Sequence, residues 1–64
     1  MNAGKVLWFD EFKGYGYIRL DDGREVYFHA TSVKFSGNLT AGSTVLFDVF
    51  ETTIGWEASN VEAA

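Results

Sequence analysis

Apolar and polar residues alternate with a period of two over several short stretches of this chain. Successive side chains of a β-strand point to opposite faces of its sheet, so this alternation indicates strands that are buried on one face. Turn-forming residues separate the stretches, which are rich in valine, isoleucine and aromatic residues. We predict five strands, at residues 4–9, 14–20, 25–29, 44–51 and 56–61.

The connections between these strands complete an all-β prediction. Asp22-Gly23, between the second and third predicted strands, is a typical hairpin dipeptide. The longer connection over 30–43 has room for one helical turn near 31–33. No segment carries a sustained apolar period of 3.6 residues, so we expect little helix.

The second predicted strand has an apolar face and an aromatic face. Ile18 and Leu20 point to the face that suits a core. The opposite face carries Lys13, Tyr15, Tyr17 and Arg19. Glycines alternate with the two tyrosines, and glycine inside a strand often marks a bend or a close approach of two backbones.

The third and fourth predicted strands continue this division. Val26 and Phe28 point inward in the third strand, whereas Tyr27 and His29 point outward. In the fourth strand, the set that suits the core is Val45, Phe47 and Val49. Two neighbouring strands therefore present outward aromatic rings, and exposed aromatic patches commonly mark binding surfaces.

Outward rings with cations beside them suit one chemistry in particular. Single-stranded DNA and RNA bind where bases stack on aromatic rings and phosphates meet cations. A B-form duplex is read by elements that enter a groove, which a flat sheet face does not do. The same tyrosines could instead stabilise the sheet through cross-strand pairs. The alternation alone favours neither nucleic-acid binding nor sheet packing as the role of these tyrosines.

Length and composition exclude several classes of function. A chain of 64 residues is near the lower limit for folding alone, and we place one domain at residues 1–64. The chain has no cysteine and one histidine, so we expect no disulfide, no metal site and no cofactor. Its residues offer no clear set of acid, base and nucleophile, so we expect neither an enzyme nor a small-molecule substrate.

The charge of the chain is −4, and an ordinary acidic surface is the simplest explanation for it. The basic residues are unevenly distributed, however. All five precede position 35, and residues 35–64 contain four acidic residues and no lysine or arginine. A site for a polyanion should therefore lie in the N-terminal half, and its affinity should not come mainly from charge.

The sequence shows no targeting or membrane segment. Its start lacks the basic residues and apolar run of a secretory signal. No apolar stretch approaches the roughly 20 residues that span a membrane. We expect a cytoplasmic protein with no membrane partner, and a monomer in preference to an oligomer.

The aromatic face resembles the motifs of bacterial cold-shock proteins. Residues 13–18, Lys-Gly-Tyr-Gly-Tyr-Ile, are similar to the first ribonucleoprotein motif of this family, with tyrosine at both aromatic positions. Residues 26–29, Val-Tyr-Phe-His, continuing through Ser32-Val33, are similar to the second motif. Residues 6–9 resemble the first strand of the family. Further matches, which extend the resemblance over nearly the whole chain, occur at 21–23, 41–42 and 58–61.

The resemblance implies a five-stranded antiparallel barrel of the oligonucleotide-binding (OB) fold. It also implies binding of single-stranded RNA or DNA with weak sequence preference, often for pyrimidines, and RNA-chaperone action. Carried over by position, the base-stacking residues are Trp8, Tyr15, Tyr17, Tyr27 and His29, with Lys13 near phosphate. Phe9 is a further candidate, although Trp8 and Phe9 should point to opposite faces unless the strand bulges.

The chain departs from the family pattern at several positions. Ala30 replaces a stacking phenylalanine, Leu7 replaces a basic residue, and the 34–43 loop is shorter. Residues 54–56, Ile-Gly-Trp, replace a basic residue and a proline. Either the affinity is reduced or other rings rebuild the surface, and the candidates are Phe12, Phe35 and Trp56. For Phe35, anchoring of the loop is an equal alternative.

A small barrel that binds proline-rich or extended peptides is the alternative function. Exposed tyrosine and tryptophan side chains also bind such peptides. Binding of a homopyrimidine oligonucleotide at low salt separates the two hypotheses.

Overall fold

The computed structural model describes residues 2–34 and 39–64. Its elements are β1 (Asn2–Asp10), β2 (Tyr15–Leu20), β3 (Glu25–His29), the 3₁₀ helix η1 (Ala30–Ser32), β4 (Thr44–Thr52) and β5 (Gly55–Ala63). These elements confirm the five predicted strands and the helical turn, with ends that differ by at most two residues. No helix in the described part of the chain is long and apolar enough to cross a membrane.

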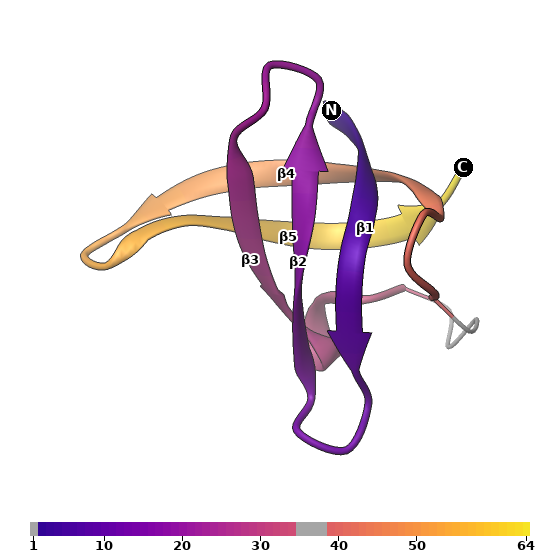
Figure 1. The fold of residues 1–64 in the computed structure, drawn as a ribbon. Helices are drawn as coiled ribbons and strands as arrows, with labels where there is room; N and C mark the ends of the chain where they lie inside the picture. The colour runs from indigo at the N-terminus through magenta and orange to yellow at the C-terminus, as the bar shows by residue number, and fades with distance from the viewer. Residues whose placement is uncertain (1, 35–38) are drawn as a thin grey trace.

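The five strands close into a barrel with the order β1-β2-β3-β5-β4. Figure 1 shows β1, β2 and β3 side by side, with the β4–β5 hairpin crossing behind them. Four of the five pairings are antiparallel, but β3 and β5 run parallel, with Tyr27 opposite Glu57. A second parallel bridge joins Val33, just after η1, to Val61 on β5. Closure pairs every strand on both sides.

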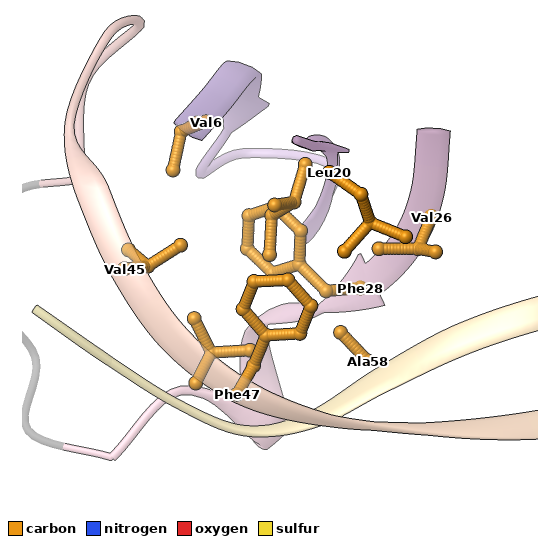
Figure 2. Packing of buried hydrophobic residues seen from close by; sticks show 9 residues of the cluster. Val6, Leu20, Val26, Phe28, Val45, Phe47 and Ala58 are labelled. Atoms are coloured by element: carbon orange, nitrogen blue, oxygen red, sulfur yellow. The ribbon is translucent and has the colours of Figure 1, made fainter. Parts of the chain in front are cut away.

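Nine buried side chains form the core, which is wholly apolar in the described residues. They are Val6, Ile18, Leu20, Val26, Phe28, Val45, Phe47, Ala58 and Val61. Figure 2 shows the rings of Phe28 and Phe47 at the centre of this cluster. Burial of a side chain of this size contributes about 1.5–3 kcal/mol. The cluster therefore dominates the stability of a chain whose net free energy of unfolding is roughly 3–9 kcal/mol.

The inward faces predicted for β2 and β3 are confirmed, and β4 differs at one position. Val45 and Phe47 are buried as predicted, whereas Val49 is only partly buried and packs at the edge of the core. The register of the β4–β5 pair shifts between Leu46 and Asp48. Beyond this irregularity the β4–β5 hairpin extends past β3 toward its turn (Figure 1).

Gly16 allows β1 and β2 to approach closely. A Cβ atom at this position would overlap the carbonyl oxygen of Trp8 and lie 2.9 Å from the Cα atom of Phe9. It would also lie 3.0 Å from the ring of Phe28. Two of these three obstacles are backbone atoms, which cannot rotate away. The close approach predicted from the glycine pattern is therefore confirmed here.

Lys13 lies in the β1–β2 turn, and its predicted place on the outward face of the second strand was wrong. Asp10 ends β1, and its Oδ1 accepts hydrogen bonds from the backbone N–H groups of Phe12 and Lys13 at 3.0 and 3.1 Å. The Gly14 N–H donates to the Asp10 carbonyl oxygen at 2.7 Å. Because an aspartate that bonds the following backbone favours a turn, strand alternation begins only at Tyr15.

Candidate nucleic-acid interface

Aromatic rings from three neighbouring strands form one continuous patch on the outside of the barrel. Trp8 lies on β1, Tyr15 and Tyr17 on β2, and Tyr27 on β3. We call these four residues, together with His29 at the end of β3, the aromatic surface. The outward orientation predicted for the β2 and β3 residues is confirmed, because their neighbours along each strand are buried or face the core.

Each of the four rings contacts two of the other three. The Trp8 centroid lies 5.2 Å from that of Tyr15 and 5.6 Å from that of Tyr17. The Tyr27 centroid lies 5.9 Å from that of Tyr15 and 6.0 Å from that of Tyr17. An aromatic pair of this kind contributes about 0.5–1.5 kcal/mol beyond its buried area. The rings therefore hold one another in place before any ligand binds.

A β-bulge in β1 turns Trp8 outward. Val6 lies opposite Ile18 and Trp8 lies opposite Tyr17, so Leu7 is the extra residue of β1. Val6 is buried, and regular alternation would send Trp8 into the core as well. The extra residue shifts the alternation by one position. Trp8 consequently joins Tyr17 on the outer face, with 41% of its surface exposed.

Phe9 points away from the aromatic surface. Its ring stacks on the buried ring of Phe28, with centroids 5.4 Å apart, and packs against the edge of the core. Phe9 also lines an open hollow whose other lining residues are Trp8, Asp10, Glu11, Phe12, Leu39, Thr40 and Ala41. Phe9 therefore supports the strand that carries Trp8, and the bulge does not bring both rings to one face.

His29 extends the aromatic surface beside Tyr15, which lies opposite it in the β2–β3 register. Its Nδ1 accepts a hydrogen bond from the backbone N–H of Thr31 at 3.1 Å and lies 2.9 Å from the Thr31 Oγ1. A neutral imidazole that accepts at Nδ1 carries its proton on Nε2. The Nε2–H group is therefore the donor that His29 can offer to a ligand.

Exposed cations lie at both ends of the aromatic surface. Lys13 is in the β1–β2 turn at one end. At the other end, beyond Tyr17, Lys5 on β1 lies directly opposite Arg19 on β2. Like charges in such positions repel each other, although the Arg19 guanidinium also pairs with the exposed Glu25 carboxylate at 3.6 Å. The sequence pattern did not reveal the Lys5–Arg19 pair, because it depends on the register of two strands.

Trp56 lies at the start of β5, where its ring meets a cation. The Arg24 guanidinium lies 5.5 Å from the ring centroid. Asp22 holds Arg24, accepting hydrogen bonds from its backbone N–H at 3.0 Å and from its Nε at 2.8 Å. The backbone bond, followed by the guanidinium beside it, lowers the pKa of the Asp22 carboxyl below its ordinary value. Trp56 is 47% exposed and forms a second aromatic position near the β2–β3 turn.

The remaining candidate positions have different surroundings. Ala30 is partly buried at the start of η1, directly after His29. Phe12 is 95% exposed in the β1–β2 turn and lines the hollow beside Trp8. Phe35 lies outside the described residues. Phe50 on β4, which the sequence pattern did not single out, is a further exposed ring.

Comparison with known proteins shows extensive similarity to one family. The family model described as the "Cold-shock" DNA-binding domain matches residues 2–64. The chain is 40% identical to cold shock protein CspD of Bacillus subtilis over 63 residues, which cover 95% of this chain and 96% of the relative. It is 38% identical to cold shock protein CspB of Geobacillus stearothermophilus over the same length and with the same coverage.

A solved structure confirms the fold. The structure of Drosophila Unr CSD456 matches with a TM-score of 0.81 at 22% identity, over 98% of this chain and 26% of that longer chain. The all-β barrel of the OB fold, predicted from the sequence, is therefore confirmed. The family match is confirmed in the same way by the sequence comparisons. This chain belongs to the cold-shock domain family, whose members are nucleic-acid-binding proteins.

Proposed function

We propose that this protein binds single-stranded RNA or DNA by stacking bases on the aromatic surface. The observation that carries this proposal is the patch of four contacting rings outside a core that is complete without them. Each stacked base contributes about 1–3 kcal/mol. Several stacked bases can therefore provide useful affinity in a protein whose net charge is −4.

The cations define where the phosphates lie in this proposal. Lys13 at one end and the Lys5–Arg19 pair at the other end flank the rings. A bound strand that crosses the surface between them has its bases over the tyrosines and its backbone near cations at both ends. A phosphate between Lys5 and Arg19 also relieves the repulsion of these opposed charges. Charge then positions the strand, and stacking supplies most of the affinity.

Selective binding of the single strand gives the protein an RNA-chaperone activity in this proposal. A flat surface that stacks unpaired bases does not enter a duplex groove. Binding therefore stabilises the open form of a hairpin by mass action, without ATP. At a free protein concentration of about 100 times Kd, this stabilisation is about 2.7 kcal/mol. Such a free energy opens weak hairpins and leaves stable ones closed.

Opening of a weak RNA hairpin tests the proposed function. A fluorophore and a quencher at the two ends of the stem report opening as protein is added without ATP. The wild-type protein should raise the fluorescence to a plateau, and a Tyr15→Ala, Tyr27→Ala double variant should raise it much less at equal folded concentration. A wild-type protein that binds the stable duplex as well as it binds the open strand would refute the proposal.

The peptide-binding alternative gives a different result in the same conditions. It expects no binding of a homopyrimidine oligonucleotide even at low salt, and measurable binding of a proline-rich peptide.

The monomeric state and the cytoplasmic location remain predictions. Sedimentation of the free protein and of its complex tests the monomeric state.

A further inference from the structure

An acidic side chain interrupts the outer face of the barrel next to the aromatic surface. Glu57 on β5 lies opposite Tyr27 in the parallel β3–β5 pairing and opposite Phe50 in the antiparallel β4–β5 pairing. Paired residues of neighbouring strands share a face, and Ala58, the next residue along β5, is buried in the core. The Glu57 carboxylate therefore lies on the outer face, between an exposed phenylalanine and a tyrosine of the aromatic surface.

The Glu57 carboxylate has unused hydrogen-bonding capacity. The residue is partly buried, yet no described residue donates a hydrogen bond to its side chain or pairs with its charge. An ionised carboxylate offers two acceptor oxygens and no donor. A group that is partly removed from water and lacks a partner gains most from a ligand that brings donors to it.

A bound nucleic acid offers two kinds of group to this carboxylate. Phosphates carry negative charge and would be repelled, so the backbone of the strand should lie elsewhere. Bases carry N–H donors on their Watson–Crick edges, which single strands leave free for recognition. Guanine presents two adjacent donors there, N1–H and the 2-amino group, which match the two oxygens of one carboxylate. Thymine and uracil present a single N3–H between two carbonyl oxygens, which a carboxylate repels.

We propose that Glu57 selects a guanine at the base position beside Tyr27. In this arrangement the base stacks on the tyrosine ring, and its N1–H and 2-amino groups donate to the two Glu57 oxygens. The inference rests on the proposed function, because it needs a strand on the aromatic surface. It adds a specific base at one position to a surface that is otherwise tolerant of sequence, and it departs from the pyrimidine preference that the family resemblance implies.

A set of heptamers tests this assignment. Heptathymidine is compared with seven variants, each with one deoxyguanosine at a different position, by fluorescence titration of the wild-type protein. One guanine position should tighten binding relative to heptathymidine, within the range of about 5- to 150-fold that a good bidentate contact gives. Glu57→Gln should abolish this gain and keep the affinity for heptathymidine or raise it. Glu62→Gln, which removes the same charge further along β5, should retain the guanine preference.

A base analogue gives a second measurement that needs no variant protein. Deoxyinosine keeps the N1–H of guanine and lacks the 2-amino group, so it should lose most of the gain at the selected position. If the wild-type protein binds heptathymidine but shows no guanine preference at any position, the assignment of Glu57 is overturned and the proposed function stands. A uniform tightening of all oligonucleotides by Glu57→Gln, with the preference intact, would show a merely repulsive charge and would also overturn it. Failure of every oligonucleotide to bind would overturn the proposed function itself.

Discussion

Tyr17 and Ile18 are neighbours in β2 that serve opposite faces, so alanine at each position separates binding from folding. The Tyr17 ring lies on the aromatic surface between those of Trp8 and Tyr27. The Ile18 side chain is fully buried in the core. The two substitutions should therefore give opposite patterns of affinity and stability.

The structure sets the size of each effect. Tyr17→Ala removes one base platform, which costs about 1–3 kcal/mol of binding, or roughly 5- to 150-fold in Kd. It also removes two ring contacts, each worth about 0.5–1.5 kcal/mol of folding free energy. Ile18→Ala leaves a cavity in the core and costs about 2–5 kcal/mol of stability. That loss is a large part of the roughly 3–9 kcal/mol expected for a chain of this length.

Urea denaturation gives the free energy of unfolding, and titration with heptathymidine gives Kd corrected for the folded fraction. Tyr17→Phe keeps both the ring platform and the ring contacts, so it serves as the matched control and should bind nearly as well as the wild type. The reasoning fails if Ile18→Ala weakens binding per folded molecule as much as Tyr17→Ala does. It also fails if Tyr17→Ala leaves the affinity unchanged.

Three further outcomes are expected from other parts of the structure. Ala30→Phe adds a ring beside His29 and should tighten heptathymidine binding by up to about 1–3 kcal/mol, with no gain for tetrathymidine; unchanged or weaker heptamer binding would show that the space is already used. The slope of log K against log salt should be about −1 to −2, because few cations flank the rings, and a slope steeper than about −4 would show that phosphate contacts dominate. Gly16→Ala should cost on the order of 3 kcal/mol, since the new Cβ meets the backbone of β1; an unchanged urea midpoint would contradict this close approach.

The alternation of residues was sufficient to predict the faces of β2 and β3. In these strands one set of alternate residues is buried, and the other set is aromatic or charged. The pairing of β2 with β3 has no register shift that would interrupt this alternation. Tyr15, Tyr17 and Tyr27 consequently lie where the pattern placed them. A period of two is a strong signal whenever one face of a strand is buried and the other is not.

Features that depend on contacts between distant segments could not be predicted in the same way. The outward orientation of Trp8 needs an extra residue at Leu7, which is visible only from the pairing of β1 with β2. The Lys5–Arg19 pair depends on that same register. The approach of Glu57 to Tyr27 arises from the parallel closure of β3 on β5, which joins residues far apart in the chain.

Local turn chemistry explains the position of Lys13. The spacing of two residues between Lys13 and Tyr15 predicts that both side chains lie on one face of a strand. The Asp10 carboxylate, however, accepts hydrogen bonds from the backbone of Phe12 and Lys13 and holds both residues in a turn before the strand begins. A carboxylate that accepts hydrogen bonds from residues two and three positions later overrides the tendency to extend. Asp10 was therefore the residue in the sequence that indicated a turn at Lys13 instead of a strand.

Fluorescence of a protein with a single tryptophan tests base stacking on the aromatic surface most directly. Trp56→Phe leaves Trp8 as the only tryptophan, and Trp8→Phe leaves Trp56 near the β2–β3 turn. Titration of Trp56→Phe with heptathymidine should quench the Trp8 emission to a saturable limit, because a base then stacks on the indole ring. Titration of Trp8→Phe should quench the Trp56 emission much less, although competition of this unlabelled variant with the wild-type protein for heptathymidine should still detect its binding. Heptathymidine binding that leaves the Trp8 emission unchanged would place the strand elsewhere and contradict the account.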